Sequence, residues 1–338
     1  LAIVNLVTAL LGAVTALTGA LMGYGVWTLV VAPIVMFWTR AVGMSWVSRT
    51  LIWPTFDFRG SGPLFAYGFA IIASQFFWLV QTQADVVIAG RALPLAELGL
   101  YTTALFLTQL IATKFVPPLN DVAFPAFARI QHDPEAIRWN FQKAIRLIML
   151  VTAPLYLGLS VSAEALIATL FQPKWAGMAP LVSVLALAMP FITLQILFAP
   201  ISFATGHPRI PTFTAMGGAL LFGTAFLVGV QWGAAGLTLG WLVAAPLLLA
   251  VTIALSQRAS HVGFADVAGA AGPALGCAAV MALAVAALDR LTGVGDWPAI
   301  ARLAALVTTG GAVYAAAIWA LQRPMIDELI RLARRQPA

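Results

Sequence analysis

The sequence predicts an all-α protein that crosses a membrane many times, and two observations support this fold class. Hydrophobic residues make up 62% of the 338 residues and charged residues only 9%, whereas a soluble domain carries about 25% charged residues. The apolar residues also gather in runs of roughly 20, the length that a helix needs to cross about 30 Å of hydrocarbon. We expect about ten helices, at 1–20, 26–45, 63–89, 98–118, 142–171, 177–204, 210–231, 234–256, 267–288 and 300–321.

The first two predicted helices form a hairpin around a glycine-rich turn. Their phrase GALMGYGVWTLVVAPIV (19–35) is similar in style to FLVGVQWGAAGLTLGWLVAAPLL (226–248), where two later helices flank a turn with glycine and tryptophan. Two hairpins of one design indicate a duplicated architecture. The chain starts inside an apolar run without an initiator methionine, so we expect an N-terminal truncation.

The third predicted helix, 63–89, carries four polar side chains: Gln75, Gln81, Gln83 and Asp85. Such side chains are costly in hydrocarbon, so we expect them to face protein or water. Asp85 lies about twenty residues into the helix, which places it near the outer interface. It is interpreted as an interfacial or helix-capping acid, or as a coupling or gating group, and Glu164 near the outer end of 142–171 has the same alternatives.

The segments 45–63 and 120–146 are predicted to be the longest cytoplasmic connections. In the second, the phrase HDPE indicates a new helix, with Asp133 as the cap and Pro134 at the first helical position. The later apolar runs contain further prolines and glycines, which membrane helices tolerate. The single cysteine, Cys277, excludes an internal disulfide framework and fits packing between helices.

The basic residues are distributed unevenly between the two sides of the predicted bundle. One set of connections holds fourteen of them and the other four, and the positive-inside rule places the richer set in the cytoplasm. Leu1 and the C-terminal tail then lie on the cytoplasmic side, and no nucleic-acid partner is expected. The poorer set is Arg91, Lys174, Arg290 and Arg302; the richer set is Arg40, Arg49, Arg59, Lys114, Arg129, Arg138, Lys143, Arg146, Arg209, Arg258, Arg323, Arg331, Arg334 and Arg335.

The sequence offers no catalytic constellation. His132, His207 and His261 stand in predicted loops at unrelated spacings, and neither a P-loop nor a G-x-S-x-G motif occurs. We therefore expect neither an enzyme nor a metal site nor a cofactor. Transport without an ATPase of its own fits better, and coupling to a monovalent-cation or proton gradient stays open.

Three cations and three amides are the candidate substrate contacts. Arg40, Lys114 and Arg146 each lie a little inside a predicted cytoplasmic helix end. Their side chains either extend to the surface or turn inward to meet an anionic substrate, and arginine suits phosphate because its planar fork can bind two oxygens. Gln75, Gln81 and Gln109 are candidates for hydrogen bonds to sugar hydroxyls or between helices.

An ordered set of phrases resembles the lipid-linked oligosaccharide flippases, the polysaccharide biosynthesis branch of the multidrug/oligosaccharidyl-lipid/polysaccharide exporter superfamily. The resemblance covers about residues 1–260. The phrases are GYGVWTLV (23–30), ADVVIAG (84–90), LGLYTTA (98–104), VAFPAFARIQHD (122–133), AEALIATLFQPKWAGMAPL (163–181) and FATGHPR (203–209).

The resemblance implies a fold of two six-helix lobes around a cavity that opens alternately to each side. It assigns 1–62 to the last two helices of the first lobe and a connection, 63–256 to the second lobe, and 257–338 to two additional helices and a basic tail. The four helices that begin the first lobe are then missing from this chain.

The function implied is transfer of a polyprenyl-pyrophosphate-linked oligosaccharide across the bacterial inner membrane, in contact with membrane lipids and other polysaccharide assembly proteins. The alternatives are a cation-coupled drug or lipid exporter of the same superfamily, and a membrane-bound glycan polymerase, ligase or acyltransferase.

Overall fold

The computed structural model describes residues 2–48, 62–207, 209–291 and 297–321, and within these ranges every regular element is helical. Eight stretches of described helix are long and apolar enough to cross a membrane, and two of them, Pro173–Ala204 and Arg209–Ser260, each hold more than one helix. The polar helix α3 is not among the eight. The elements are α1 (Ala2–Leu21), α2 (Trp27–Ser48), α3 (Gly62–Ala92), α4 (Leu95–Arg129), α5 (Pro134–Leu170), the short 3₁₀ helix η1 (Pro173–Met178), α6 (Ala179–Ile196), α7 (Phe198–Ala204), α8 (Arg209–Gly229), η2 (Val230–Trp232), α9 (Gly233–Ser260), α10 (Phe264–Leu291) and α11 (Ala299–Leu321).

The predicted fold class is confirmed, and each of the ten predicted runs corresponds to a helix. The run 177–204 is divided, since α6 gives way to α7 at Leu197. Within the segment 120–146, α5 begins at Pro134, where the phrase HDPE indicated a new helix. The continuation of α4 to Arg129 was not predicted, because these residues extend beyond the apolar run. The segment 45–63 falls mostly outside the described residues.

Contacts divide the chain into two units, Leu1–Pro63 and Leu64–Ala338. Unit 1 contains the α1–α2 hairpin, whose turn has positive φ angles at Gly23 (77°) and Gly25 (52°), a conformation that glycine adopts without strain. The two helices approach closely where glycines of α1 meet larger residues of α2. A Cβ at Gly19 would lie 2.8 Å from the Thr28 hydroxyl oxygen, so the absence of a side chain permits this packing.

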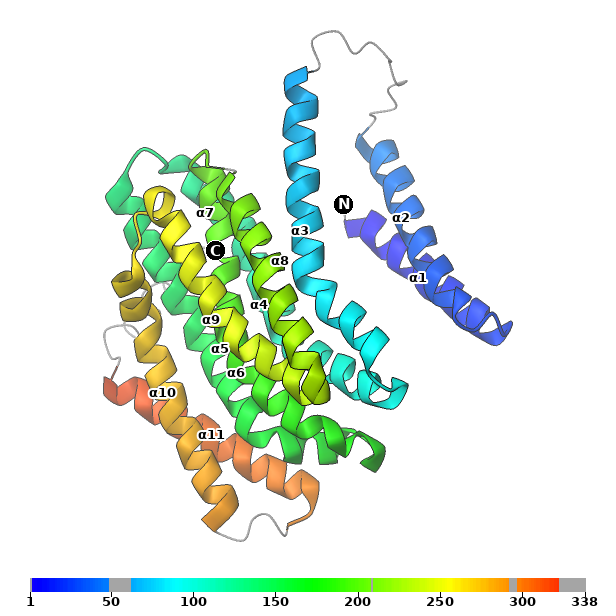
Figure 1. Cartoon of the computed structure of the whole chain (residues 1–338), viewed down its shortest axis with the longest axis vertical. Coiled ribbons are helices and arrows are strands. Elements are labelled where there is room, and N and C mark those ends of the chain that lie inside the picture. The colour runs from blue at the N-terminus through cyan, green and yellow to red at the C-terminus, as the bar shows by residue number, and fades with distance from the viewer. Residues whose placement is uncertain (1, 49–61, 208, 292–296, 322–338) are drawn as a thin grey trace. The chain divides into compact units, whose positions relative to one another are not determined.

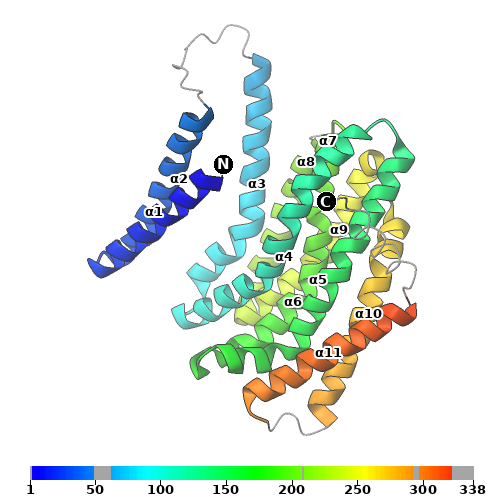
Figure 2. The same cartoon turned by 180° about the vertical axis from the view of Figure 1, so that it is seen from behind.

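Unit 2 is a bundle in which α5 packs against both α6 and α10, α6 against α9, and α9 against α8 (Figures 1 and 2). The bundle has two ends, called the Glu97 end and the Asp133 end. At the Glu97 end, helices α3, α5, α8 and α10 finish and α4, α6, α9 and α11 begin. At the Asp133 end, α4 and α9 finish and α5 and α10 begin. The additional helices α10 and α11 pack on α5 within this unit. The assignment of residue ranges to exporter lobes stays a prediction.

Three apolar clusters are buried among the described residues of unit 2, and the two larger ones lie one toward each end. The cluster toward the Glu97 end includes Tyr101, Leu185 and Trp241, and the one toward the Asp133 end includes Phe141, Phe198 and Ile253. In the second cluster, the Phe141 and Phe198 rings meet edge to face, with centroids 4.8 Å apart. Such packing fixes α5 against α7.

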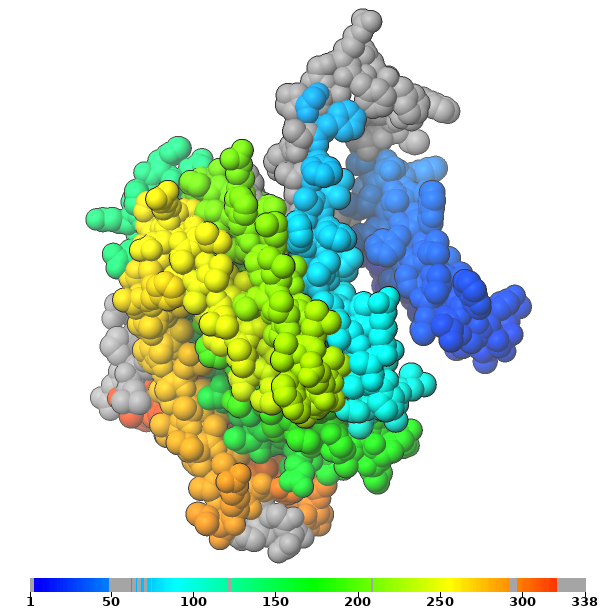
Figure 3. Space-filling model, viewed as in Figure 1, coloured from blue at the N-terminus to red at the C-terminus, as the bar shows by residue number. Residues whose placement is uncertain are grey.

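Two local features of the sequence explain how helices of unit 2 begin and pack. Asp133 caps α5 as predicted, since its Oδ1 accepts from the backbone N–H groups of Glu135 (3.1 Å) and Ala136 (3.0 Å). In the α8–α9 hairpin, Gly229 and Gly236 face each other so closely that a Cβ on either would overlap the other's carbonyl group. Figure 3 shows the side chains of α8 and α9 side by side on one face of unit 2.

Candidate functional site

Asp85 lies at the centre of a buried hydrogen-bond network that joins three helices. The residue is 0% exposed. Its Oδ2 accepts a hydrogen bond of 2.6 Å from the Tyr101 hydroxyl of α4 and one of 3.2 Å from the Trp241 indole of α9. Its Oδ1 accepts from the Val86 backbone N–H at 2.8 Å. Both oxygens are therefore partnered, the condition under which a protein interior tolerates a polar group.

The indole of Trp241 is held in place by two phenylalanines of α8. Its ring centroid lies 4.8 Å from that of Phe222 and 5.5 Å from that of Phe226. All three side chains belong to the buried core. The apolar wall thus orients the indole N–H toward the carboxylate and excludes water from the network.

Asp85 does not cap a helix, because it lies within α3 and its carboxylate is buried and bonded across helices. Its position near the outer membrane interface stays a prediction. A coupling or gating role for Asp85 stays a prediction. Chemically, the network links α3, α4 and α9 through one carboxylate.

Sequence reasoning missed both donors of this network. A signal for Tyr101 exists: α3 ends at Ala92 and α4 begins at Leu95, so positions 85 and 101 are equally distant from the turn between them. Facing positions in an antiparallel helical hairpin share this property. Trp241 stands 156 residues from Asp85, and only the tertiary fold brings the two together.

A second acid, Glu97, joins α4 to the start of α9 at the Glu97 end of the bundle. Glu97, in the first turn of α4, accepts a hydrogen bond of 2.7 Å from the backbone N–H of Ala234. The adjacent Gly233 has φ of 70°, and a Cβ there would lie 2.6 Å from the Glu97 carboxylate. Glu97 therefore caps the start of α9 from another helix and compensates an N–H group that the helix leaves free.

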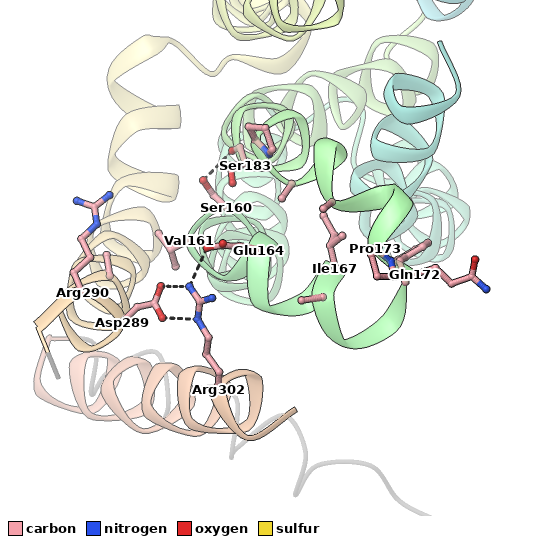
Figure 4. Close-up of a pocket in the computed structure, with 16 residues that line it drawn as sticks. Ser160, Val161, Glu164, Ile167, Gln172, Pro173, Ser183, Asp289, Arg290 and Arg302 are labelled. Atoms are coloured by element: carbon pink, nitrogen blue, oxygen red, sulfur yellow. Dashed lines mark hydrogen bonds and ion pairs between the residues drawn. The ribbon is translucent and has the colours of Figure 1, made fainter. Parts of the chain in front are cut away.

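Glu164 belongs to an ion-paired group at the Glu97 end. The Arg302 guanidinium of α11 binds Asp289 of α10 through two nitrogens, each at 2.8 Å, and reaches Glu164 of α5 at 3.0 Å. Figure 4 shows these side chains converging from three helices. They line a pocket of about 1020 Å³. The predicted coupling or gating role of Glu164 stays a prediction.

A corresponding ion pair lies at the Asp133 end. Arg138 of α5 binds the Asp266 carboxylate of α10 through Nε at 3.2 Å and Nη2 at 2.5 Å. Asp266 also accepts from the Gln142 amide at 2.8 Å and from the Gly263 backbone N–H at 2.9 Å. Helix α10 is thus tied to α5 near both of its ends.

The candidate substrate contacts are not gathered in the pocket at Glu164. Lys114 and Arg146 of unit 2 and Arg40 of unit 1 are exposed, as is Gln75, while Gln109 is half-buried. Gln81 differs, since it is 3% exposed and packs against Gly218 of α8, where a Cβ would overlap its amide oxygen. That oxygen lacks a hydrogen-bond partner among the described residues.

Within the described ranges, no three His, Cys, Asp or Glu side chains lie close enough together to hold a metal ion.

Known proteins with similar sequences come from bacterial polysaccharide assembly. Over 99% of its length the chain is 26% identical to the succinoglycan biosynthesis transport protein ExoT of Rhizobium meliloti (strain 1021), of which it covers 68%. It is 29% identical over 192 residues to the teichuronic acid biosynthesis protein TuaB of Bacillus subtilis (strain 168) and 27% identical over 196 residues to the lipopolysaccharide biosynthesis protein WzxC of Escherichia coli (strain K12). The matched parts are 56% of this chain in both cases, but only 39% of TuaB and 38% of WzxC.

The fold also has a counterpart among solved structures. The lipid II flippase MurJ in an inward-closed conformation matches 95% of this chain and 68% of its own with a TM-score of 0.71 and 14% sequence identity, which shows a shared fold. The family model described as polysaccharide biosynthesis protein matches residues 1–180, more than half of the chain. These findings confirm the resemblance found in the sequence: the chain belongs to the polysaccharide biosynthesis protein family and has a flippase-type helical fold.

Proposed function

We propose that this chain is part of a transporter that moves a polyprenyl-pyrophosphate-linked oligosaccharide from the cytoplasmic to the outer leaflet of a bacterial inner membrane by alternating access. The observation that carries the proposal is the alignment of nearly the whole chain with a protein named as a polysaccharide transport protein. The fold shared with a lipid II flippase supports it.

The physical task explains why a protein is needed. A diphosphate with sugars attached carries charges and hydroxyls whose transfer into hydrocarbon is prohibitive without hydrogen-bond partners. A translocator must offer this headgroup a polar route and leave the polyprenyl tail in lipid. Exposed cations and amides on membrane-spanning helices suit such a route.

The proposed orientation places the Asp133 end of unit 2 in the cytoplasm. The adjoining parts of α4 and α5 at this end carry Arg129, Arg138 and Lys143, with Lys114 and Arg146 farther along the same helices. This excess of positive charge follows the positive-inside rule. The Glu97 end then faces outward.

Lys114 and Arg146 are the proposed contacts for the diphosphate within unit 2, and Arg40 is the proposed contact in unit 1. All three are exposed, so their charges are available to a ligand. Arg138 differs from them because Asp266 occupies its guanidinium. Gln75 and Gln109 are proposed to meet sugar hydroxyls. Gln81 could do so only if α3 and α8 separated, since its amide is packed against Gly218.

Asp85 has a proposed role in gating. Its bonds to Tyr101 and Trp241 tie α3 to α4 and α9 at the end proposed to face outward. An opening movement there must either carry the three helices together or break these bonds.

The proposal is tested in cells that carry a deletion of the complete gene. Surface glycan should disappear, and the lipid-linked units should stay inaccessible to a glycosidase added to spheroplasts. The complete gene should restore both. Normal surface glycan in the deletion strain, with no second exporter present, would contradict the proposal.

A further inference from the structure

The pocket at the Glu97 end of unit 2 is separate from the proposed route of the diphosphate. It has a volume of about 1020 Å³, at the upper end of the roughly 300–1,000 Å³ typical of small-molecule sites. The ends of α5 and α10 and the starts of α6 and α11 line it together with η1. None of Asp85, Lys114 and Arg146 is among its lining residues.

Four charged residues line this pocket, Glu164, Asp289, Arg290 and Arg302, and Arg302 forms ion pairs with Glu164 and Asp289. Arg302 and Asp289 have side chains only 15% and 17% exposed, and their two-nitrogen contact uses the guanidinium fork. The Glu164 side chain is 73% exposed, so its carboxylate offers acceptors to the pocket while still touching Arg302. In Figure 4, the Arg290 side chain points away from this group.

This pairing disfavours an anionic ligand. A phosphate or carboxylate group beside Arg302 would also lie beside two acids, Glu164 and Asp289, which already engage that arginine. The second lining arginine, Arg290, points away from this group in Figure 4. It also disfavours a simple cation, because Arg302 stands between the two carboxylates. A neutral ligand that both donates and accepts hydrogen bonds fits the arrangement best.

The other lining groups suit a saccharide. Ser160 donates to the Ser183 carbonyl at 2.8 Å, which leaves the serine oxygen able to accept a hydrogen bond. Phe171 lines the pocket and meets Trp175 edge to face, with ring centroids 6.3 Å apart. Sugar rings present hydroxyls at their edge and C–H groups on their faces, so they match a wall that combines carboxylate, hydroxyl and aromatic surface.

We propose that this pocket binds the saccharide part of the glycan on the outer side of the membrane. The inference rests on the proposed function, because it assumes that the Glu97 end faces outward and that a glycan arrives there. A site that binds the glycan on this side stabilises the state of the transporter in which the glycan has crossed the membrane. The helices α10 and α11, which lie beyond the proposed six-helix lobe, supply Asp289 and Arg302, two of the three members of the ion-paired group.

The experiment measures binding of a soluble saccharide to the complete protein in nanodiscs. The probe is the oligosaccharide released from the lipid-linked glycan by mild acid and freed of phosphate, and its dissociation constant is measured by titration calorimetry. Ala168→Trp fills the pocket from an exposed lining position, and Glu164→Gln removes a charged acceptor. The matched control is Leu170→Trp, at a position on the same helix that is 63% exposed and outside the lining.

We expect binding to weaken about tenfold or more in Ala168→Trp and Glu164→Gln, since about 1.4 kcal/mol corresponds to tenfold and a bond to a charged group contributes about that much. Leu170→Trp should bind like the wild type. Equal binding by wild type and Ala168→Trp, or displacement of the probe by inorganic phosphate, would overturn the inference.

A flipping assay separates this inference from the proposed function. The complete protein is reconstituted in vesicles with a fluorescent lipid-linked oligosaccharide, and arrival in the opposite leaflet is followed with an impermeant quencher. Flipping without binding of the soluble saccharide would overturn the inference and leave the proposed function standing. Binding at the pocket without flipping would contradict the proposed function alone.

Discussion

The Tyr101 hydroxyl donates a hydrogen bond of 2.6 Å to the Asp85 carboxylate in a site from which water is excluded. The two residues come from consecutive helices, and Trp241 closes the network from α9. A buried acid with fixed donors of this kind stabilises one arrangement of three helices, because any other arrangement leaves the carboxylate without partners.

Tyr101→Phe should lower the stability of the protein. The substitution removes one donor from a buried carboxylate and leaves the shape of the ring unchanged, so a loss of about 1–3 kcal/mol is expected. The measurement is the thermal midpoint of the purified protein in detergent. Gln83→Ala, at an exposed position of α3, is the control and should change stability by less than about 0.5 kcal/mol. Equal midpoints for Tyr101→Phe and wild type would show that the hydrogen bond does not stabilise this state.

Gly236→Ala should prevent α8 and α9 from packing as they do. A Cβ at this position would overlap the Gly229 carbonyl group, and backbone atoms in two helices cannot move aside as a flexible side chain can. We expect little folded protein, measured as the monodisperse peak in fluorescence-detected size-exclusion chromatography. Gly223→Ala is the matched control on α8, where a Cβ would meet no atom within 4 Å. Because alanine favours helix by up to about 1 kcal/mol over glycine, this control should be neutral or stabilising. A normal peak for Gly236→Ala would show that the hairpin is less tightly packed.

The ion pair between Asp289 and Arg302 should be needed to hold α11 against α10. Both side chains are mostly buried, and removing one leaves the other charge without its partner. Arg302→Ala is expected to cost about 1–3 kcal/mol and to expose α11 to limited proteolysis. Arg290→Ala removes the neighbouring charge, which points away from the pair in Figure 4, and should change proteolysis little. If Asp289→Ala and Arg302→Ala had fully additive effects, the two residues would not be energetically coupled.

The sequence allowed the helices to be predicted because their signal is local. Runs of apolar residues of membrane length marked each span, and the phrase at Asp133 and Pro134 marked the start of α5. The polar end of α4 was missed, since its last turns extend beyond the apolar run.

The side-chain partners could not be predicted in the same way. Glu97 and Ala234 are 137 residues apart, and no local sequence pattern predicts that an acid in one helix caps the start of another helix. From its residue type, Gln81 was a candidate for hydrogen bonds to sugar hydroxyls or between helices, whereas its burial depends on the small Gly218 on α8. Burial and pairing of polar groups follow from which helices meet, and that information is spread over the whole chain.

Lys114→Ala and Arg146→Ala should impair glycan export without lowering the amount of protein in the membrane. Each side chain is exposed, so its loss leaves the core intact and should cost little stability. If each binds a phosphate oxygen, its removal should cost about 1.5–3 kcal/mol of binding, which corresponds to a decrease of about ten- to a hundredfold in affinity. The measurement is the initial rate of flipping in vesicles over a range of substrate concentrations, with the complete protein carrying each substitution.

Lys174→Ala is the control, because Lys174 is an exposed cation at the opposite end of unit 2, where its ammonium lies over the Trp175 ring at 5.9 Å. The Lys174→Ala substitution should leave the flipping rate unchanged.

The conservative variants Lys114→Arg and Arg146→Lys keep the positive charge, but Arg146→Lys loses the planar guanidinium fork that binds two oxygens. If the charge alone attracts the diphosphate, both conservative variants keep most of the rate. If Arg146 binds two oxygens at once, the flipping rate of Arg146→Lys should fall toward that of Arg146→Ala, while the rate of Lys114→Arg should not fall. Unchanged flipping in both alanine variants would assign Lys114 and Arg146 to membrane orientation or lipid contact, since topology requires positive charge at this end but no particular geometry.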